Sequence, residues 1–393
     1  MSSRDNQRNR TTPDRSTSLS SLALLFLRLG TTAFGGPAAH IAMMEDEVVR
    51  RRTWMTRAEF LDLLGAANII PGPNSTELAI HIGHRQRGWP GLLVAGSSFI
   101  LPAVLIVIGF AWAYVRYGSL PQVAGVLYGV KPVIIAIVLQ ALWSLGRTAI
   151  KSKFLAVVGI FAVALTFLRI HELLVLFGGG LAAVLARTVA RQIKSAKSLI
   201  TVPILTMLFQ TGAGGAASFG LLPLFLFFLK VGAILYGSGY VLLAFIRADL
   251  VERWHWLTET QLLDAIAVGQ VTPGPVFTTA TFVGYVLGGV RGAMVATLGI
   301  FLPAFFFVAV SGPLVPRIRR SPMAGAFLDG VNVAALALML VVTYQLGRAA
   351  LVDFTTLVLA LISAFVLFRF RVNSAWLILV GAVVGWFLHS AAS

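Results

Sequence analysis

The stretch Ile70-Pro71-Gly72-Pro73 has a counterpart in Thr272-Pro273-Gly274-Pro275, which follows it at an offset of 202 residues. Both copies lie inside apolar segments. Because proline lacks an amide donor and clashes with the preceding helical turn, two prolines around a glycine cannot lie within one continuous helix. Each motif therefore predicts a break between two short half-helices that form a re-entrant hairpin.

The same offset relates further residues on both sides of the motif. Gly30, Gly35, Glu47, Trp54 and Thr56 match Gly232, Gly237, Asp249, Trp256 and Thr258. After one deletion the correspondence continues from Gly88 to Gly289 and from Leu101-Pro102 to Leu302-Pro303. The chain thus consists of two homologous halves. Corresponding helix breaks in two halves are typical of a secondary transporter whose site lies between the repeats.

The composition predicts an all-α polytopic membrane protein. The chain is 58% hydrophobic and only 12% charged, whereas soluble domains hold about 25% charged residues. Apolar runs of membrane-spanning length recur along the chain. The net charge of +16 comes from short loops between these runs, where the positive-inside rule accounts for it, so we expect a lipid bilayer and no nucleic acid as partner.

Several chemistries are excluded or lack support in the sequence. The chain has no cysteine, so disulfides and thiolate metal sites are excluded. No phosphate-binding G-x-x-x-x-G-K-[ST] motif, no metal-ligand spacing and no catalytic triad motif occurs. We therefore expect no cofactor, no metal and no enzymatic activity.

The chain divides into four parts. Residues 1–18 form a polar tail that we expect to be disordered, 19–190 the first repeat, 191–220 a basic and Gly/Ala-rich linker, and 221–393 the second repeat. Each half holds six apolar segments, of which the second carries the Pro-Gly-Pro motif. About five crossings per half remain, and an odd number inverts the second half.

The loop charges support inverted repeats, since Arg and Lys concentrate on the side that holds Arg50–Arg52. The basic tail is the misfit in this topology. It would fit if the first segment were itself re-entrant, or if the second segment crossed.

Three basic residues, Arg28, Lys131 and Lys230, lie within apolar segments, and Arg28 and Lys230 are repeat partners. A charge at the membrane centre costs at least ~2.5 kcal/mol, so such residues usually face a cavity or a partner. A symmetric pair of cations suits a divalent anion. The alternative is that Arg28 and Lys131 extend toward the headgroups.

The other residues that we expect to bind substrate lie at or near the breaks. Glycine and proline leave backbone amides free, and hydroxyls at the positive end of a helix favour an oxyanion. Close helix packing and ordinary capping are the alternatives. This set consists of Gly35, Gly36, Asn68, Pro71, Gly72, Pro73, Ser75 and Thr76 in the first half, and of Gly237, Gly239, Gln270, Pro273, Gly274, Pro275, Thr278 and Thr279 in the second.

Four ionisable residues are candidates for proton coupling. Glu77 and His81 share one helix face at i,i+4 spacing, and Asp62 and Asp264 are repeat partners before the breaks. Titratable groups inside a membrane often form proton relays. The alternative is pairing with nearby arginines or helix capping. Since Thr279 replaces Glu77 in the second half, a proton role there would be asymmetric.

The second half carries a long motif, Leu235-Tyr236-Gly237-Ser238-Gly239-Tyr240 followed by Gln270-Val271-Thr272-Pro273-Gly274-Pro275-Val276-Phe277-Thr278-Thr279. With Phe34-Gly35-Gly36-Pro37-Ala38-Ala39-His40 in the first half, it resembles the chromate ion transporter superfamily in its long two-domain form. The resemblance covers nearly the whole chain from about residue 19. The first half departs from the family pattern on both sides of its Pro-Gly-Pro motif, where it reads Asn68-Ile69-Ile70-Pro71-Gly72-Pro73-Asn74-Ser75-Thr76-Glu77.

The resemblance implies a secondary transporter that exports chromate from the cytoplasm across the inner membrane of a bacterium or archaeon and gives chromate resistance. The membrane potential or proton exchange would drive it. The alternative on the same fold is uptake or exchange of sulfate or another oxyanion. A membrane-embedded enzyme and a passive channel are less favoured, and a homodimer stays open.

Overall fold

The computed structural model describes residues 17–34, 36–118, 120–194, 218–236, 239–319, 321–370 and 372–392. Most of the expected tail (1–18) and linker (191–220), together with Gly35 and Gly237, lies outside them. Every regular element within the described ranges is a helix, which confirms the all-α fold. Five of these helices are long and apolar enough to cross a membrane.

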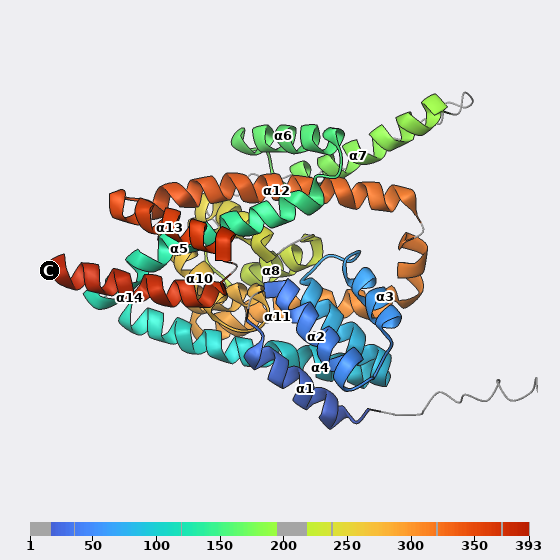
Figure 1. The fold of residues 1–393 in the computed structure, drawn as a ribbon, viewed down its shortest axis with the longest axis horizontal. Helices are drawn as coiled ribbons and strands as arrows, with labels where there is room; N and C mark the ends of the chain where they lie inside the picture. The colour runs from blue at the N-terminus through green and yellow to red at the C-terminus, as the bar shows by residue number, and fades with distance from the viewer. Residues whose placement is uncertain are drawn as a thin grey trace, which may run out of the picture.

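The helices of the first half recur in the same order in the second (Figure 1). The first half contains α1 (Leu19–Thr32), α2 (Gly36–Glu45), the π-helix η1 (Asp46–Arg51), α3 (Arg57–Ala67), α4 (Asn74–Tyr117), α5 (Pro121–Ala149), α6 (Lys153–Phe167) and α7 (Glu172–Lys194). The second contains α8 (Leu221–Ile234), η2 (Gly239–Val241), α9 (Leu242–Phe245), η3 (Ile246–Arg253), α10 (Glu259–Val271), η4 (Val276–Thr278), α11 (Thr279–Arg319), α12 (Pro322–Ala350), α13 (Phe354–Phe370) and α14 (Ser374–Ala392).

The two longest helices, α4 and α11, are hairpins. Each turns at a glycine with a positive φ, +59° at Gly88 and +60° at Gly289, a conformation that other residues adopt only with strain. The arms touch closely behind the turn, since a Cβ on Gly83 would lie 2.2 Å from the carbonyl oxygen of Gly91. Each hairpin therefore consists of a short arm that follows the Pro-Gly-Pro motif and a long arm.

The Pro-Gly-Pro segment of the first half enters and leaves at one end of the molecule. Helix α3 starts with a capping box between Thr56 and Glu59, and Glu59 forms an ion pair with Arg85 at the far end of the short arm of α4 (3.0 Å). Gln86 also donates to the carbonyl oxygen of Trp54 (3.1 Å). This is the re-entrant hairpin that two prolines around a glycine predict.

The first apolar segment also returns to the end where it started, which agrees with the re-entrant alternative that the basic tail suggested. Arg87 donates to the carbonyl oxygen of Thr17 (2.6 Å), which lies just before α1. Helix α1 has 14 residues, about 21 Å, which is short of a ~30 Å hydrocarbon core. The second half repeats this arrangement, because Phe219 contacts Trp256 ring to ring. Within the described residues, the segments that contain α1 and α8 therefore turn back toward the end where they begin.

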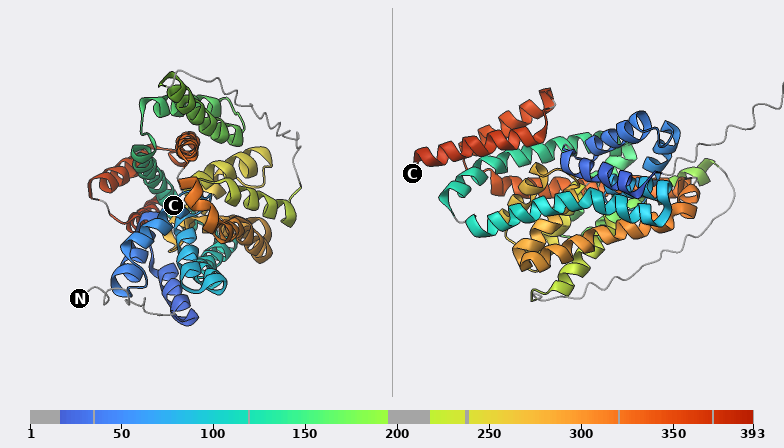
Figure 2. Two further views of the ribbon diagram at one scale, coloured as in Figure 1. Left: turned by 90° about the vertical axis from the view of Figure 1, so that its right-hand side faces the viewer. Right: turned by 90° about the horizontal axis from the view of Figure 1, so that it is seen from below.

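The hairpins of the two halves lie toward opposite ends of the molecule (Figures 1 and 2). The long arm of α4 leads away from the first-half hairpins and α5 returns, where Lys151 forms an ion pair with Asp329 near the start of α12 (2.7 Å). At the other end of α12, Arg348 lines a pocket together with Arg247 and Glu259 of the second-half hairpins.

Candidate functional site

The two Pro-Gly-Pro breaks are joined by reciprocal hydrogen bonds between the halves. The amide of Gly72 donates to the carbonyl oxygen of Leu235 (2.8 Å), and the amide of Gly274 donates to that of Ala33 (3.0 Å). Ala33 and Leu235 are themselves repeat partners and end α1 and α8. Each Pro-Gly-Pro glycine therefore bonds to the residue that ends the first helix of the other half. The breaks after α1 and α8 and the two Pro-Gly-Pro breaks thus meet at the interface between the repeats.

A small cavity of about 20 Å³ lies between these breaks. Helix α4 begins on one side of it and η4 with α11 on the other, and the first-turn amides of a helix have no intrahelical partners. Its volume holds about one water molecule, so the cavity is closed to a larger ligand in this structure. It is lined by Pro37, Gly72, Pro73, Asn74, Ser75, Gly239, Pro275, Val276 and Phe277.

Buried polar side chains link the breaks around this cavity. His40, which is 2% exposed, contacts the Ala33 carbonyl oxygen with Nε2 (3.0 Å) and the Ser75 hydroxyl with Nδ1 (3.2 Å). Sequence reasoning assigned His40 no role, although it stands in the motif that carries the family resemblance. Its place on the short helix directly after a break is the signal that could have identified it.

Two buried hydrogen-bond donors of the expected substrate set have no partner among the described residues. They are the hydroxyl of Thr76 and the Nε2 amide of Gln270, whose Oε1 accepts from Tyr240 (3.1 Å). Buried polar atoms without partners are rare in proteins and often mark a place for a ligand. By contrast, the hydroxyls of Thr278 and Thr279 donate to carbonyl oxygens of their own helix (both 2.8 Å), which is the local bonding that we gave as the alternative.

The two expected cations each contact an acid. Arg28 lies 3.4 Å from Glu47, and Lys230 lies 2.6 Å from Asp249. The acids are repeat partners, so the same ion pair occurs in both halves. Neither cation lines the central cavity. In this conformation their charges are compensated, and a two-cation anion site stays a prediction.

Lys131 and Asp264, expected in different roles, lie together across the two halves. Lys131 Nζ is 3.4 Å from Asp264, and the hydroxyl of Tyr114 donates to the same carboxylate (2.8 Å). Asp264 is 1% exposed, whereas its repeat partner Asp62 is exposed. The second-half aspartate is thus the buried one of the two.

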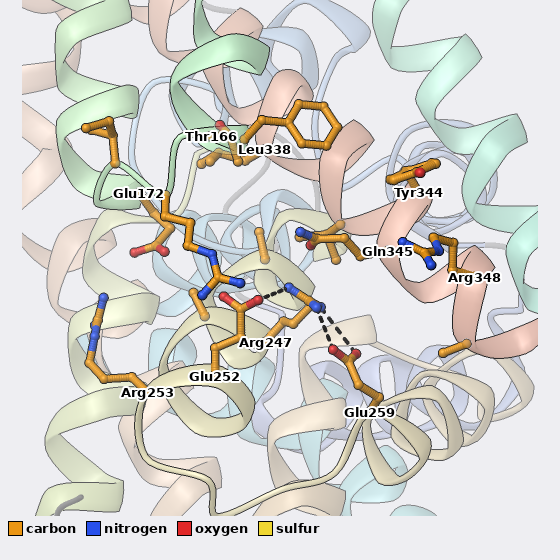
Figure 3. A pocket seen from close by; sticks show the side chains of 17 residues that line it. Thr166, Glu172, Arg247, Glu252, Arg253, Glu259, Leu338, Tyr344, Gln345 and Arg348 are labelled. Carbon is orange, nitrogen blue, oxygen red and sulfur yellow. Dashed lines mark hydrogen bonds and ion pairs between the residues drawn. The ribbon is translucent and has the colours of Figure 1, made fainter. Parts of the chain in front are cut away.

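A larger pocket of about 740 Å³ lies at the end of the second-half hairpins (Figure 3). Arg247 lies between Glu252 and Glu259 and pairs with both. Sequence reasoning treated these charges as ordinary loop residues, because it could not show that α12 and the loop after α6 lie against them. The charged residues that line the pocket are Arg169, Glu172, Arg247, Glu252, Arg253, Glu259 and Arg348.

Comparison with known proteins identifies the repeated unit. A family model described as chromate transporter matches residues 20–184 and again 222–386. A chromate transport protein of Cupriavidus metallidurans is 33% identical over 374 residues, covering 93% of this chain and 92% of that protein. A chromate transport protein of Pseudomonas aeruginosa is 31% identical over 379 residues, covering 92% and 90%.

An uncharacterised transporter of Bacillus subtilis is 31% identical over 154 residues, which cover 38% of this chain and 86% of that protein. One repeat thus approximates the length of a whole relative. No solved structure matches the chain. From the two matches to the family model and the two long relatives, we conclude that the chain belongs to the chromate transporter family.

Proposed function

We propose that the protein is a secondary active transporter that exports chromate from the cytoplasm across the inner membrane of a bacterium or archaeon. The observation that carries the proposal is the meeting of the two Pro-Gly-Pro breaks. Amides at the starts of two opposed half-helices converge on one cavity, which is how broken helices bind anionic groups in transporters. Chromate is a tetrahedral dianion, and amides and hydroxyls from both halves suit its oxygens.

The closed cavity supports alternating access rather than a continuous pore. Since about 20 Å³ is too small for chromate, the breaks have to separate before an anion binds. The hydrogen bonds of Gly72 and Gly274 are the contacts that such a movement breaks. Because each links one half to the other, rocking of the halves opens the cavity toward one end at a time.

We further propose that the halves are inverted in the membrane. Helices α5 and α12 occupy the same place in the two halves. Lys151, just after α5, pairs with Asp329 near the start of α12, and Tyr128, near the start of α5, donates to Asp353 just after α12. The two equivalent helices thus run antiparallel, which supports inversion. The chain has no cysteine, so single cysteines can be introduced directly. A membrane-impermeant thiol reagent should label Thr355→Cys from outside intact cells and Ser152→Cys only after permeabilisation. Labelling of both from the same side contradicts inversion.

Thr76 and Gln270 do not line the closed cavity, and they are the side-chain donors that we assign to the anion once the breaks separate. A hydrogen bond to a charged group contributes about 1.5–3 kcal/mol, so Thr76→Val should weaken the apparent affinity for chromate by roughly tenfold or more. Thr343→Val is the matched control, since Thr343 is also buried but donates to the Met339 carbonyl oxygen within α12. Equal affinities of the two variants would remove Thr76 from the site.

We propose that Arg28 and Lys230 bind the anion only after the closed cavity opens. Arg28 and Lys230 lie on the helices that precede the breaks, and we propose that they exchange their acids for the anion when a half opens. Arg28→Ala and Lys230→Ala should then abolish transport while the protein remains folded in the membrane. Full transport by both variants refutes the two-cation site.

The decisive assay measures accumulation of labelled chromate in inside-out membrane vesicles, with and without a proton gradient and with excess sulfate. Energised accumulation that sulfate inhibits weakly establishes a chromate exporter. Equal competition by sulfate favours a general oxyanion carrier on the same fold, and no accumulation refutes export. The proposal is of a transporter and not an enzyme, and it requires no second copy of the chain.

A further inference from the structure

Glu77 is a buried acid at the first Pro-Gly-Pro break. It lies in the first turn of α4, directly behind the break, and its side chain is fully inaccessible to solvent. Within the part of the chain that the structure describes, neither carboxyl oxygen has a hydrogen-bond partner. Among the described residues, no cation forms an ion pair with it. The other buried acids among the described residues, Glu47, Asp249 and Asp264, each form an ion pair with an arginine or a lysine.

The carboxyl group packs against the break itself. A Cβ on Gly72 would lie 2.4 Å from Glu77 Oε1, so the acid occupies space that only a glycine leaves open. Tyr236, on the second-half break, is close enough for electrostatic interaction with Glu77. The other titratable groups around this turn are His81, one turn along α4, and His40, which contacts the neighbouring Ser75. None of the three supplies a fixed positive charge in a described ion pair.

The protonation state of Glu77 follows from these surroundings. An ionised carboxylate in an apolar interior without partners is several kcal/mol less stable than in water, and such groups bind a proton instead. The neutral acid is therefore the form that fits this closed conformation. When the two breaks separate, water reaches the carboxyl group and the proton can leave.

We propose that Glu77 binds the proton that is exchanged for the anion, and that it does so once per transport cycle. This rests on the proposed function. The O–H bond of the acid forms in the half-open state that faces outside and breaks in the state that faces the cytoplasm, leaving a carboxylate and a released proton. Thr279, the repeat partner of Glu77, donates its hydroxyl to the Val276 carbonyl oxygen and does not titrate, so the two halves differ.

Asp264 is the rival proton carrier. It is buried, but Lys131 and Tyr114 both contact its carboxylate. A carboxylate with a cation and a hydroxyl donor is stabilised in its charged form. Neither kind of contact reaches Glu77 among the described residues, so we assign proton binding to Glu77 and a structural role between the halves to Asp264.

The test uses the full-length protein in liposomes, with labelled chromate as the probe. Two activities are compared, namely accumulation driven by a pH gradient at clamped membrane potential, and chromate–chromate counterflow without a gradient. Glu77→Gln keeps the neutral shape, so it should retain counterflow and lose at least tenfold in gradient-driven accumulation. Glu77→Asp keeps a titratable group and should accumulate chromate with a changed pH profile. The control is Asp353→Asn, in the loop before α13, which should match the wild type.

Gradient-driven accumulation by Glu77→Gln at the wild-type level overturns the proposal. Loss of counterflow as well, in folded protein, also overturns it, in favour of a role in anion binding. If the wild-type protein shows neither activity with chromate, the proposed function fails separately. Infrared spectroscopy then still tests the proton site, because the deuterium-sensitive carbonyl band of a protonated carboxyl group should be present in the wild type and in Asp264→Asn, and absent in Glu77→Gln. A band that persists in Glu77→Gln refutes the assignment.

Discussion

Replacing Gly72 by alanine should destabilise the protein through two separate effects. Gly72 has φ +137°, and residues with a side chain adopt such conformations at a cost of about 1–3 kcal/mol. The new Cβ would also lie 2.4 Å from Glu77 Oε1, and forcing an extra carbon into a packed interior costs about 1–3 kcal/mol. We expect Gly72→Ala to lower the free energy of unfolding by about 2–6 kcal/mol.

Two other glycines separate these effects. Gly88 has φ +59°, but no atom lies within 4 Å of the position that a Cβ would occupy, so Gly88→Ala should show the backbone strain alone. Gly109 lies in the long arm of α4 with ordinary helical geometry and open space around it. Gly109→Ala should leave the stability unchanged or raise it by up to ~1 kcal/mol.

The assay is reversible unfolding in mixed micelles of increasing denaturing detergent, with the three variants and the wild type in parallel. From the most to the least stable variant, the expected order is Gly109→Ala, Gly88→Ala and Gly72→Ala. In a Glu77→Ala background, the additional loss at Gly72 should disappear, which a double-mutant cycle measures directly. Gly72→Ala as stable as Gly88→Ala, or no coupling to Glu77, would refute the packing of the acid against the break.

Two further predictions concern charged groups. Lys230→Ala should lower the free energy of unfolding by about 1–3 kcal/mol, because Asp249 is 1% exposed and loses one of its two charged partners among the described residues, Lys230 and Arg253. Arg28→Ala should lower it by about 0–1 kcal/mol, because the Arg28 side chain is 56% exposed; equal losses in the same detergent titration would contradict this. The Tyr128 hydroxyl and the amide of Thr356 hold the pKa of Asp353 below its ordinary value, so the stabilisation is present above the unfolded-state pKa and is lost as the pH falls through the folded-state pKa. In Tyr128→Phe this loss should begin at a higher pH, which unfolding measured from about pH 6 to pH 3 will test.

The sequence by itself determined the local features of this protein. The break at Gly72 was predictable because proline and glycine act on their own backbone and on the adjacent turn, whatever surrounds them. The membrane class followed from hydropathy, which depends on composition alone. The two homologous halves followed from an offset that can be read directly along the chain. Each of these is decided by residues close together in sequence or by a direct match between the two copies.

Tertiary structure decided how these parts meet. That α1 turns back instead of crossing depends on contacts of Thr17 with Gln86 and Arg87, 69 and 70 residues away. The sequence also could not predict which charged residues form ion pairs. It shows that Lys131 is basic but not that Asp264 of the other half lies beside it. The isolation of Glu77 depends on every side chain around it at once. A partner, or the lack of one, is a property of packing between distant segments, and no local pattern encodes it.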